Sequence, residues 1–132
     1  MKKILLLLSV SVYLSSCSYD NLEEIHPAVA ECDTTSVSFA SDVLPIMNLH
    51  CGVDNQGCHI NSSADGGCGF ANYTDMMDYL VSSSKDIKFM KTVNHDPTLS
   101  ASLYMPQGTT EKIDECSRLK LQAWINQGKL NN

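Results

Sequence analysis

The sequence predicts an all-α fold in which short helices are joined by long loops. Apolar residues recur at the three- and four-residue spacing of amphipathic helices in several stretches. No stretch alternates apolar and polar residues in the way that is typical of a half-buried strand. Between the helical stretches lie long segments rich in Gly, Asn, Asp and Ser, which favour loops.

The N-terminal residues 1–16 resemble a bacterial lipoprotein signal. Two lysines precede a short apolar run, and small residues lead to Cys17. The run is too short to span a bilayer as a mature helix. In such signals the Cys becomes the lipidated first residue, so we expect residues 17–31 to form a lipidated tether. Ser18 fits passage to the outer membrane of the cell envelope; an ordinary secretory signal is the alternative.

The charge of the chain excludes nucleic acid as a partner on electrostatic grounds. The whole sequence has a net charge of −6, and removal of residues 1–16 takes away two lysines and no acidic residue. The mature chain then carries seven Lys and Arg against fifteen Asp and Glu, a net charge of −8. Residues 32–132 suit one small domain, and no internal repeat is visible.

The first predicted helix starts near residue 38 and delivers the chain to Cys51. Ser38 or Ser41 can cap it, and Pro45 is tolerated only in the first turn. Its apolar face carries Val43, Ile46, Met47 and His50. The next residues, 52–69, read as a glycine-containing loop.

Three further helices are expected. The first covers residues 75–81 and is capped by Asn72 or Thr74, and the second covers residues 87–93 and is capped by Asp86. Residues 94–110 are irregular. The last helix is capped by Asp114, runs to about Gln127 and stops at Gly128. Its apolar residues cover more than half of its circumference, which fits packing between a partner helix and a cofactor.

The step Cys58-His59 looks like the end of the c-type haem attachment motif, C-x-x-C-H. That motif needs a His to bind iron and thiols to reach the vinyl groups of the haem. Here Cys51 lies seven residues before Cys58, and a glycine-containing loop between them can bulge at small entropic cost. We therefore predict Cys51 and Cys58 as haem thioethers and His59 as an iron ligand.

Met105 is the predicted second ligand. It sits in an irregular segment directly before Pro106, where the backbone is held extended and the sulfur can be aimed at a fixed point. A thioether opposite a His is the axial set of electron-transfer cytochromes c, and it raises the potential relative to a second His.

Residues 32–132 resemble the small single-haem cytochrome c-like domains of lipoproteins and secreted proteins in Bacteroidota and related bacteria. The matching segments are Cys32-Asp33-Thr34-Thr35, Phe39-Ala40-Ser41-Asp42-Val43-Leu44-Pro45-Ile46, Gly57-Cys58-His59, Tyr104-Met105-Pro106, and Cys116 with Ala123-Trp124-Ile125 and Gly128. The resemblance implies a cytochrome c-like fold wrapped around one haem c. It also implies electron transfer with a redox partner protein in the envelope, and no catalytic turnover. The six residues between Cys51 and Cys58 exceed the gap found in this family.

Five cysteines follow the lipidation residue, and two assignments fit the resemblance. In the preferred one Cys51 and Cys58 bond haem, Cys32 pairs with Cys116, and Cys68 is left over. In the second, Cys51 pairs with Cys68, and Cys58 forms a single thioether. Disulfides are allowed in an exported protein.

Other interpretations of the same residues compete with this one. His95 is an alternative sixth ligand in place of Met105, whereas His50 reads as structural. A plain disulfide between Cys51 and Cys58, with His59 on the surface, needs no cofactor. A zinc site is a third option, built from Cys51, Cys58, His59 and Cys68.

At the level of function, the alternative is a haem-free, disulfide-stapled lipoprotein that serves as a structural or interaction subunit. The long gap between the haem cysteines favours it, because a maturation apparatus that expects two intervening residues can fail to recognise six. A third hypothesis makes the chain the electron-entry subunit of a larger envelope enzyme rather than a monomeric carrier.

Overall fold

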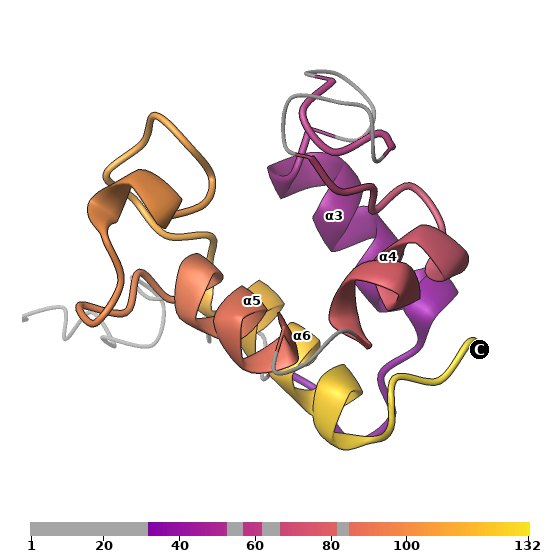
Figure 1. The fold of residues 1–132 in the computed structure, drawn as a ribbon. Coiled ribbons are helices and arrows are strands. Elements are labelled where there is room, and N and C mark those ends of the chain that lie inside the picture. The colour runs from indigo at the N-terminus through magenta and orange to yellow at the C-terminus, as the bar shows by residue number, and fades with distance from the viewer. Residues whose placement is uncertain (1–31, 53–56, 62–66, 82–84) are drawn as a thin grey trace, which may run out of the picture. The chain divides into compact units, whose positions relative to one another are not determined.

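The described part of the chain is helical, as the sequence predicts (Figure 1). The structure is a computed structural model, and it describes residues 32–52, 57–61, 67–81 and 85–132, which belong to the unit Cys32–Asn132. No residue in these ranges forms a strand. The predicted signal, Cys17 and the tether lie outside the described residues. Within those ranges, no helix has the length and apolar character needed to cross a membrane.

The first helix brings the chain to Cys51. A π-helical turn, η1 (Phe39–Val43), leads directly into α3 (Leu44–His50). Ser38 caps it, because its side-chain oxygen accepts a hydrogen bond from the Ser41 N–H at 3.3 Å. The predicted helix is confirmed. Of the two residues that were expected as its cap, Ser38 is the one observed.

Two helices follow the loop. Helix α4 (Tyr73–Leu80) is capped by Asn72, which accepts a hydrogen bond from the Asp75 N–H at 2.9 Å. Helix α5 (Lys85–Val93) already includes Asp86 in its first turn, so the prediction of Asp86 as its cap is wrong. There the carboxylate still favours the helix, because it lies near the positive end of the helix dipole.

The last helix has the expected limits. Helix α6 (Glu115–Asn126) is capped by Asp114, which accepts a hydrogen bond from the Ser117 N–H at 2.9 Å. Gly128 follows with a φ of 97°, a left-handed conformation that favours glycine and ends the helix. In the segment predicted to be irregular, a short 3₁₀ turn, η2 (Ala101–Leu103), precedes Met105.

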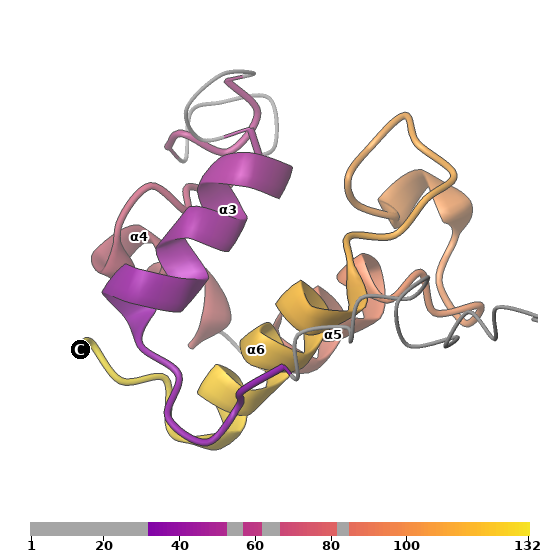
Figure 2. The same ribbon diagram turned by 180° about the vertical axis from the view of Figure 1, so that it is seen from behind.

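Helix α6 lies at the centre of the packing. It contacts both η1 and α5, α4 also contacts α5, and the two views show α5 and α6 side by side (Figures 1 and 2). Trp124 is fully buried on α6, and its ring lies 5.6 Å from that of Phe39. The indole N–H donates to the Leu130 carbonyl oxygen at 2.9 Å. The buried Trp therefore has a partner for its one polar group, as burial of an indole requires.

A disulfide joins the start of this unit to α6. Cys32 and Cys116, the pair preferred from the sequence, are bonded across a separation of 84 residues. Nearby, the Val37 N–H donates to the side-chain oxygen of Gln127 at 3.0 Å. These links hold the segment before η1 against the last helix.

Candidate functional site

A cavity of about 450 Å³ lies between the loop that follows α3 and the loop that follows α5. Its volume is within the range of small-molecule and cofactor sites, roughly 300–1,000 Å³. The first loop and the end of α3 contribute sulfur, imidazole and aromatic groups, and the second loop contributes a thioether. These lining residues are Cys51, Cys58, His59, Cys68, Phe70 and Met105. The structure therefore brings both predicted iron ligands and both predicted thioether cysteines to one cavity.

His59 is buried and held in a defined orientation. Its side chain is 7 % exposed, and its ring stacks on Phe70 with the centroids 4.8 Å apart. Its Nδ1 lies 3.0 Å from the backbone carbonyl oxygen of Cys68. When Nδ1 donates its hydrogen to that oxygen, the lone pair of the neutral ring is on Nε2. A ring fixed through one nitrogen and basic at the other is the usual state of a metal-binding His.

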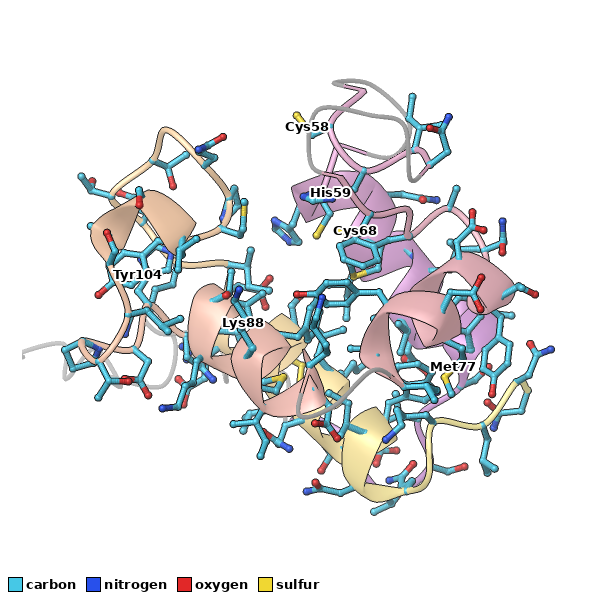
Figure 3. All side chains as sticks on the ribbon, viewed as in Figure 1. Cys58, His59, Cys68, Met77, Lys88 and Tyr104 are labelled. Atoms are coloured by element: carbon cyan, nitrogen blue, oxygen red, sulfur yellow. A yellow bond between two sulfur atoms is a disulfide. The ribbon has the colours of Figure 1, made fainter. Side chains whose placement is uncertain are left out.

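Figure 3 shows how these side chains are arranged. Cys58, His59 and Cys68 follow one another along the loop between α3 and α4, and Tyr104 lies on the other loop. Lys88 lies on α5. Met105, the next residue after Tyr104, is half-buried and lines the cavity from this second loop.

Close approach of two loop segments explains one glycine in the first loop. A Cβ at position 69 would lie only 2.8 Å from the Cα of Asn61, which is closer than side chains tolerate. Glycine at this position lets the chain pass Asn61 and place Cys68 and Phe70 around His59. The Phe70 N–H then donates to the His59 carbonyl oxygen at 2.8 Å.

Three cysteine side chains line the cavity. Burial, with smaller contributions from the neighbouring Cys68 and Cys58, raises the pKa of the Cys51 thiol to about 12. Burial also raises the pKa of Cys68, whereas Lys85 lowers it. Cys51 is thus protonated at neutral pH. All three line one cavity, and none of them forms a disulfide in this structure.

The other predicted ligands are placed differently. His95 is not among the described residues that line the cavity, and its Nε2 lies 3.0 Å from the Met105 carbonyl oxygen. His50 borders the cavity at the end of α3, and its Nε2 lies 3.4 Å from a carboxylate oxygen of Asp114. Across residues 32–52, 57–61, 67–81 and 85–132, no three His, Cys, Asp or Glu residues gather to hold a metal ion. The described residues thus hold no such cluster for the zinc alternative.

Several cavity residues were not singled out from the sequence. Phe70 and Phe89 give the cavity aromatic walls, and Lys85 and Lys88 on α5 bring positive charge to it. The spacing of Lys85 and Lys88 by three residues places them on one helix face, a signal that is visible in the sequence. The stacking of Phe70 on His59 depends on the path of the loop, so no spacing in the sequence predicts it.

Comparisons with protein-family models, with curated proteins and with solved structures find no match. Inference about function therefore depends on the residues of this cavity.

Proposed function

We propose that this chain is an electron-transfer protein that carries one covalently bound haem c, with His59 and Met105 as axial ligands. One observation carries the proposal. A single cavity is lined by Cys58 and His59 from one loop and by Met105 from another, 46 residues after His59 in the chain. A His and a Met on separate loops at one cavity are the donor set that holds haem iron in cytochromes c.

The residues of the cavity fit this group. His59 offers Nε2, because its Nδ1 is held by the Cys68 carbonyl oxygen. Phe70 and Phe89 supply apolar walls for a flat macrocycle, and Lys85 and Lys88 supply positive charge for its two carboxylates. Haem, when bound, supplies an iron that takes up and gives back one electron. The fold proposed around it is a cytochrome c-like arrangement of helices and loops.

In this proposal the two cysteines attach the haem, and His59 and Met105 bind its iron. Cys58 tethers the group through a thioether, and Cys51 adds a second thioether in the preferred assignment. His59 and Met105 stay bound in both oxidation states, so little of the protein rearranges when an electron arrives. Because His59 and Met105 would both hold the iron, the chain would leave no position for a substrate there, and we propose no catalytic turnover.

The proposed location follows from the expected N-terminus. Lipidated Cys17 would anchor the protein in the cell envelope, at the outer membrane, and residues 17–31 would tether the domain to it. The mature chain is acidic, so a redox partner protein would meet it through a basic or apolar patch. The chain acts as a monomer or as a subunit of a larger envelope complex.

A redox titration of the mature protein tests this function. The protein is produced in a host with c-type maturation machinery, and its spectrum is followed while the solution potential is varied. We expect one reversible one-electron transition, with a slope of about 59 mV per tenfold change in the ratio of oxidised to reduced protein. A folded, colourless protein without any transition would contradict the proposal. Replacement of His59 with Ala is the matched negative control.

A second candidate function is a haem-free lipoprotein that acts as a structural or interaction subunit. The disulfide between Cys32 and Cys116 and the closed packing around Trp124 favour it, because neither needs a cofactor. In the same titration this candidate predicts a colourless protein that is fully folded.

A further inference from the structure

Both polar groups of the Met105 backbone, the N–H and the carbonyl oxygen, make hydrogen bonds. Its N–H donates to the Thr92 carbonyl oxygen at 3.4 Å, and Thr92 itself belongs to α5 and lines the cavity. Its carbonyl oxygen lies 3.0 Å from Nε2 of His95. An imidazole N–H is the donor in this second bond, since a carbonyl oxygen can only accept. Both polar groups of the Met105 backbone are thus fixed relative to α5.

His95 is itself held in place by its neighbours. Its ring lies parallel to that of Tyr104, with a centroid distance of 4.6 Å and an interplanar angle of 5°. The Tyr104 hydroxyl donates to the Asp96 carbonyl oxygen at 3.1 Å. Directly before His95, Asn94 accepts a hydrogen bond from Arg118 of α6 at 2.9 Å. These contacts connect the Met105 loop to two helices.

The backbone of His95 also has a conformation that side chains rarely adopt. Its φ is 51°, in the left-handed region, where the chain turns away at the end of α5. A left-handed residue is common at the end of a helix, and His adopts this conformation more readily than most non-glycine residues. In this conformation the His95 side chain bonds to the Met105 carbonyl oxygen, and His95 is not among the described residues that line the cavity.

We propose that His95 is a positioning residue, which aims the sulfur of Met105 at the haem iron by holding the Met105 carbonyl group. This inference rests on the proposed function. His95 stays outside the iron coordination and acts through Met105. Without it, the backbone of Met105 itself keeps the Thr92 bond alone, and Met105 spends more time away from the iron. The sixth position then opens to small added ligands.

Two variants of His95 and one matched control test this. Asn tolerates a left-handed φ, so His95→Asn keeps the turn, but its side chain is too short to reach the Met105 carbonyl oxygen. His95→Phe keeps a ring for stacking on Tyr104 and removes the donor. The control is Tyr73→Phe. It removes a comparable hydrogen bond elsewhere in residues 32–132, which the Tyr73 hydroxyl donates to the Lys129 carbonyl oxygen at 2.8 Å.

The measurements are the sulfur-to-iron charge-transfer band of the oxidised holoprotein and its affinity for added imidazole. In both His95 variants we expect a weaker band and about tenfold tighter imidazole binding, as expected for the loss of one hydrogen bond that holds the native ligand. Tyr73→Phe should lower stability and leave both readouts as in the wild type. A bond with a merely structural role would give the same result in His95→Asn as in Tyr73→Phe.

The outcomes separate this inference from the proposed function. Wild-type protein with the charge-transfer band, together with folded His95 variants that keep the band and bind imidazole as weakly as the wild type, overturns the role of His95 alone. Wild-type protein without covalent haem or without the band overturns the proposed ligation, and the role of His95 with it. If His95→Phe does not fold, His95→Asn decides the question.

Discussion

The Nδ1 nitrogen of His59 lies 3.0 Å from the backbone carbonyl oxygen of Cys68, and the Cys68 sulfur lies 3.4 Å from the same nitrogen. The shorter of these contacts is to a backbone group. The orientation of His59 thus depends on the path of the loop, which Gly69 permits, and on the Phe70 ring that stacks on the imidazole.

The first prediction compares the two supports of His59. Cys68→Ala keeps the carbonyl group, so we expect His59 to remain the iron ligand and the haem spectrum to stay unchanged. Phe70→Ala removes a buried ring and its stacking on His59, so we expect a loss of about 3–5 kcal/mol in the free energy of unfolding. Absorption spectra and urea unfolding check both results. Loss of His ligation in Cys68→Ala would show that the thiol, and not the carbonyl, holds the ring.

The second prediction concerns Met105. Met105→Ala should lower the midpoint potential by on the order of 100 mV, a modest part of the ~0.8 V that axial ligands span. The cause is the loss of a thioether that stabilises reduced iron. Met77 is the control, because it is half-buried on α4 and does not line the cavity among the described residues. An unchanged potential in Met105→Ala, measured beside Met77→Ala, would remove Met105 from the ligand set.

The third prediction concerns covalent attachment. Intact-protein mass should show one bound haem in the wild type and in Cys51→Ala, where one thioether remains, and only traces in Cys58→Ala. The α-band of the reduced pyridine complex should shift in Cys51→Ala, because a vinyl group is then left unreacted. If that band is already at the single-thioether position in the wild type, Cys51 forms no thioether, as the second assignment requires.

The fourth prediction concerns the disulfide. The bond between Cys32 and Cys116 closes a long stretch of chain, with a sequence separation of 84 residues, so it restricts the unfolded state strongly. Replacement of both cysteines with Ser should lower the free energy of unfolding by about 2–5 kcal/mol. Denaturant unfolding under identical haem loading checks this. Equal stability of the double variant and the wild type would rule out the disulfide as a staple.

The fifth prediction is a pH dependence of stability. A hydrogen bond from Lys120 at 2.6 Å, and another from the Ser38 N–H, hold the pKa of Asp42 below its ordinary value. A lowered pKa in the folded state adds stability above the unfolded pKa, about 3.9, and this stability is lost as the pH falls through the lowered pKa. Asp42→Asn should lower the free energy of unfolding by about 1 kcal/mol at pH 7. It should also make that free energy fall less steeply as the pH is lowered.

The control for this fifth prediction is Asp78→Asn, which changes an exposed carboxylate on α4. The change in the free energy of unfolding at acid pH, relative to the wild type, should be larger in Asp42→Asn than in this control. If the stability of Asp42→Asn falls at acid pH as steeply as that of the wild type, the pair with Lys120 contributes nothing to the acid sensitivity.

The helices were readable from the sequence because local signals define them. Asp114 caps α6 and Gly128 follows its end, as the residue types predict. The position of Asp86 was predicted wrongly, because a carboxylate stabilises a helix both as its N-cap and in its first turn. The 3₁₀ turn at Ala101–Leu103 had no local signature in the sequence.

The site was partly predictable for a different reason. Cys58-His59 and Met105-Pro106 are chemically distinctive, so they could be singled out without coordinates. The role of His95 could not be found this way, because a histidine near a Met reads as a ligand until the bond from Nε2 to the Met105 carbonyl oxygen is seen. The thiol pairing also needs more than sequence, since Cys51, Cys58 and Cys68 all reach one cavity.

The central claim is that the Cys58-His59 loop and the Met105 loop enclose a covalently bound haem. The most direct test is a pyridine haemochrome assay on the mature protein, made in a host with c-type maturation machinery and extracted beforehand with acid acetone. We predict that one haem per chain resists extraction and gives a c-type α-band. A folded protein that keeps no haem after extraction would contradict the claim and leave the disulfide-stapled interaction subunit as the function.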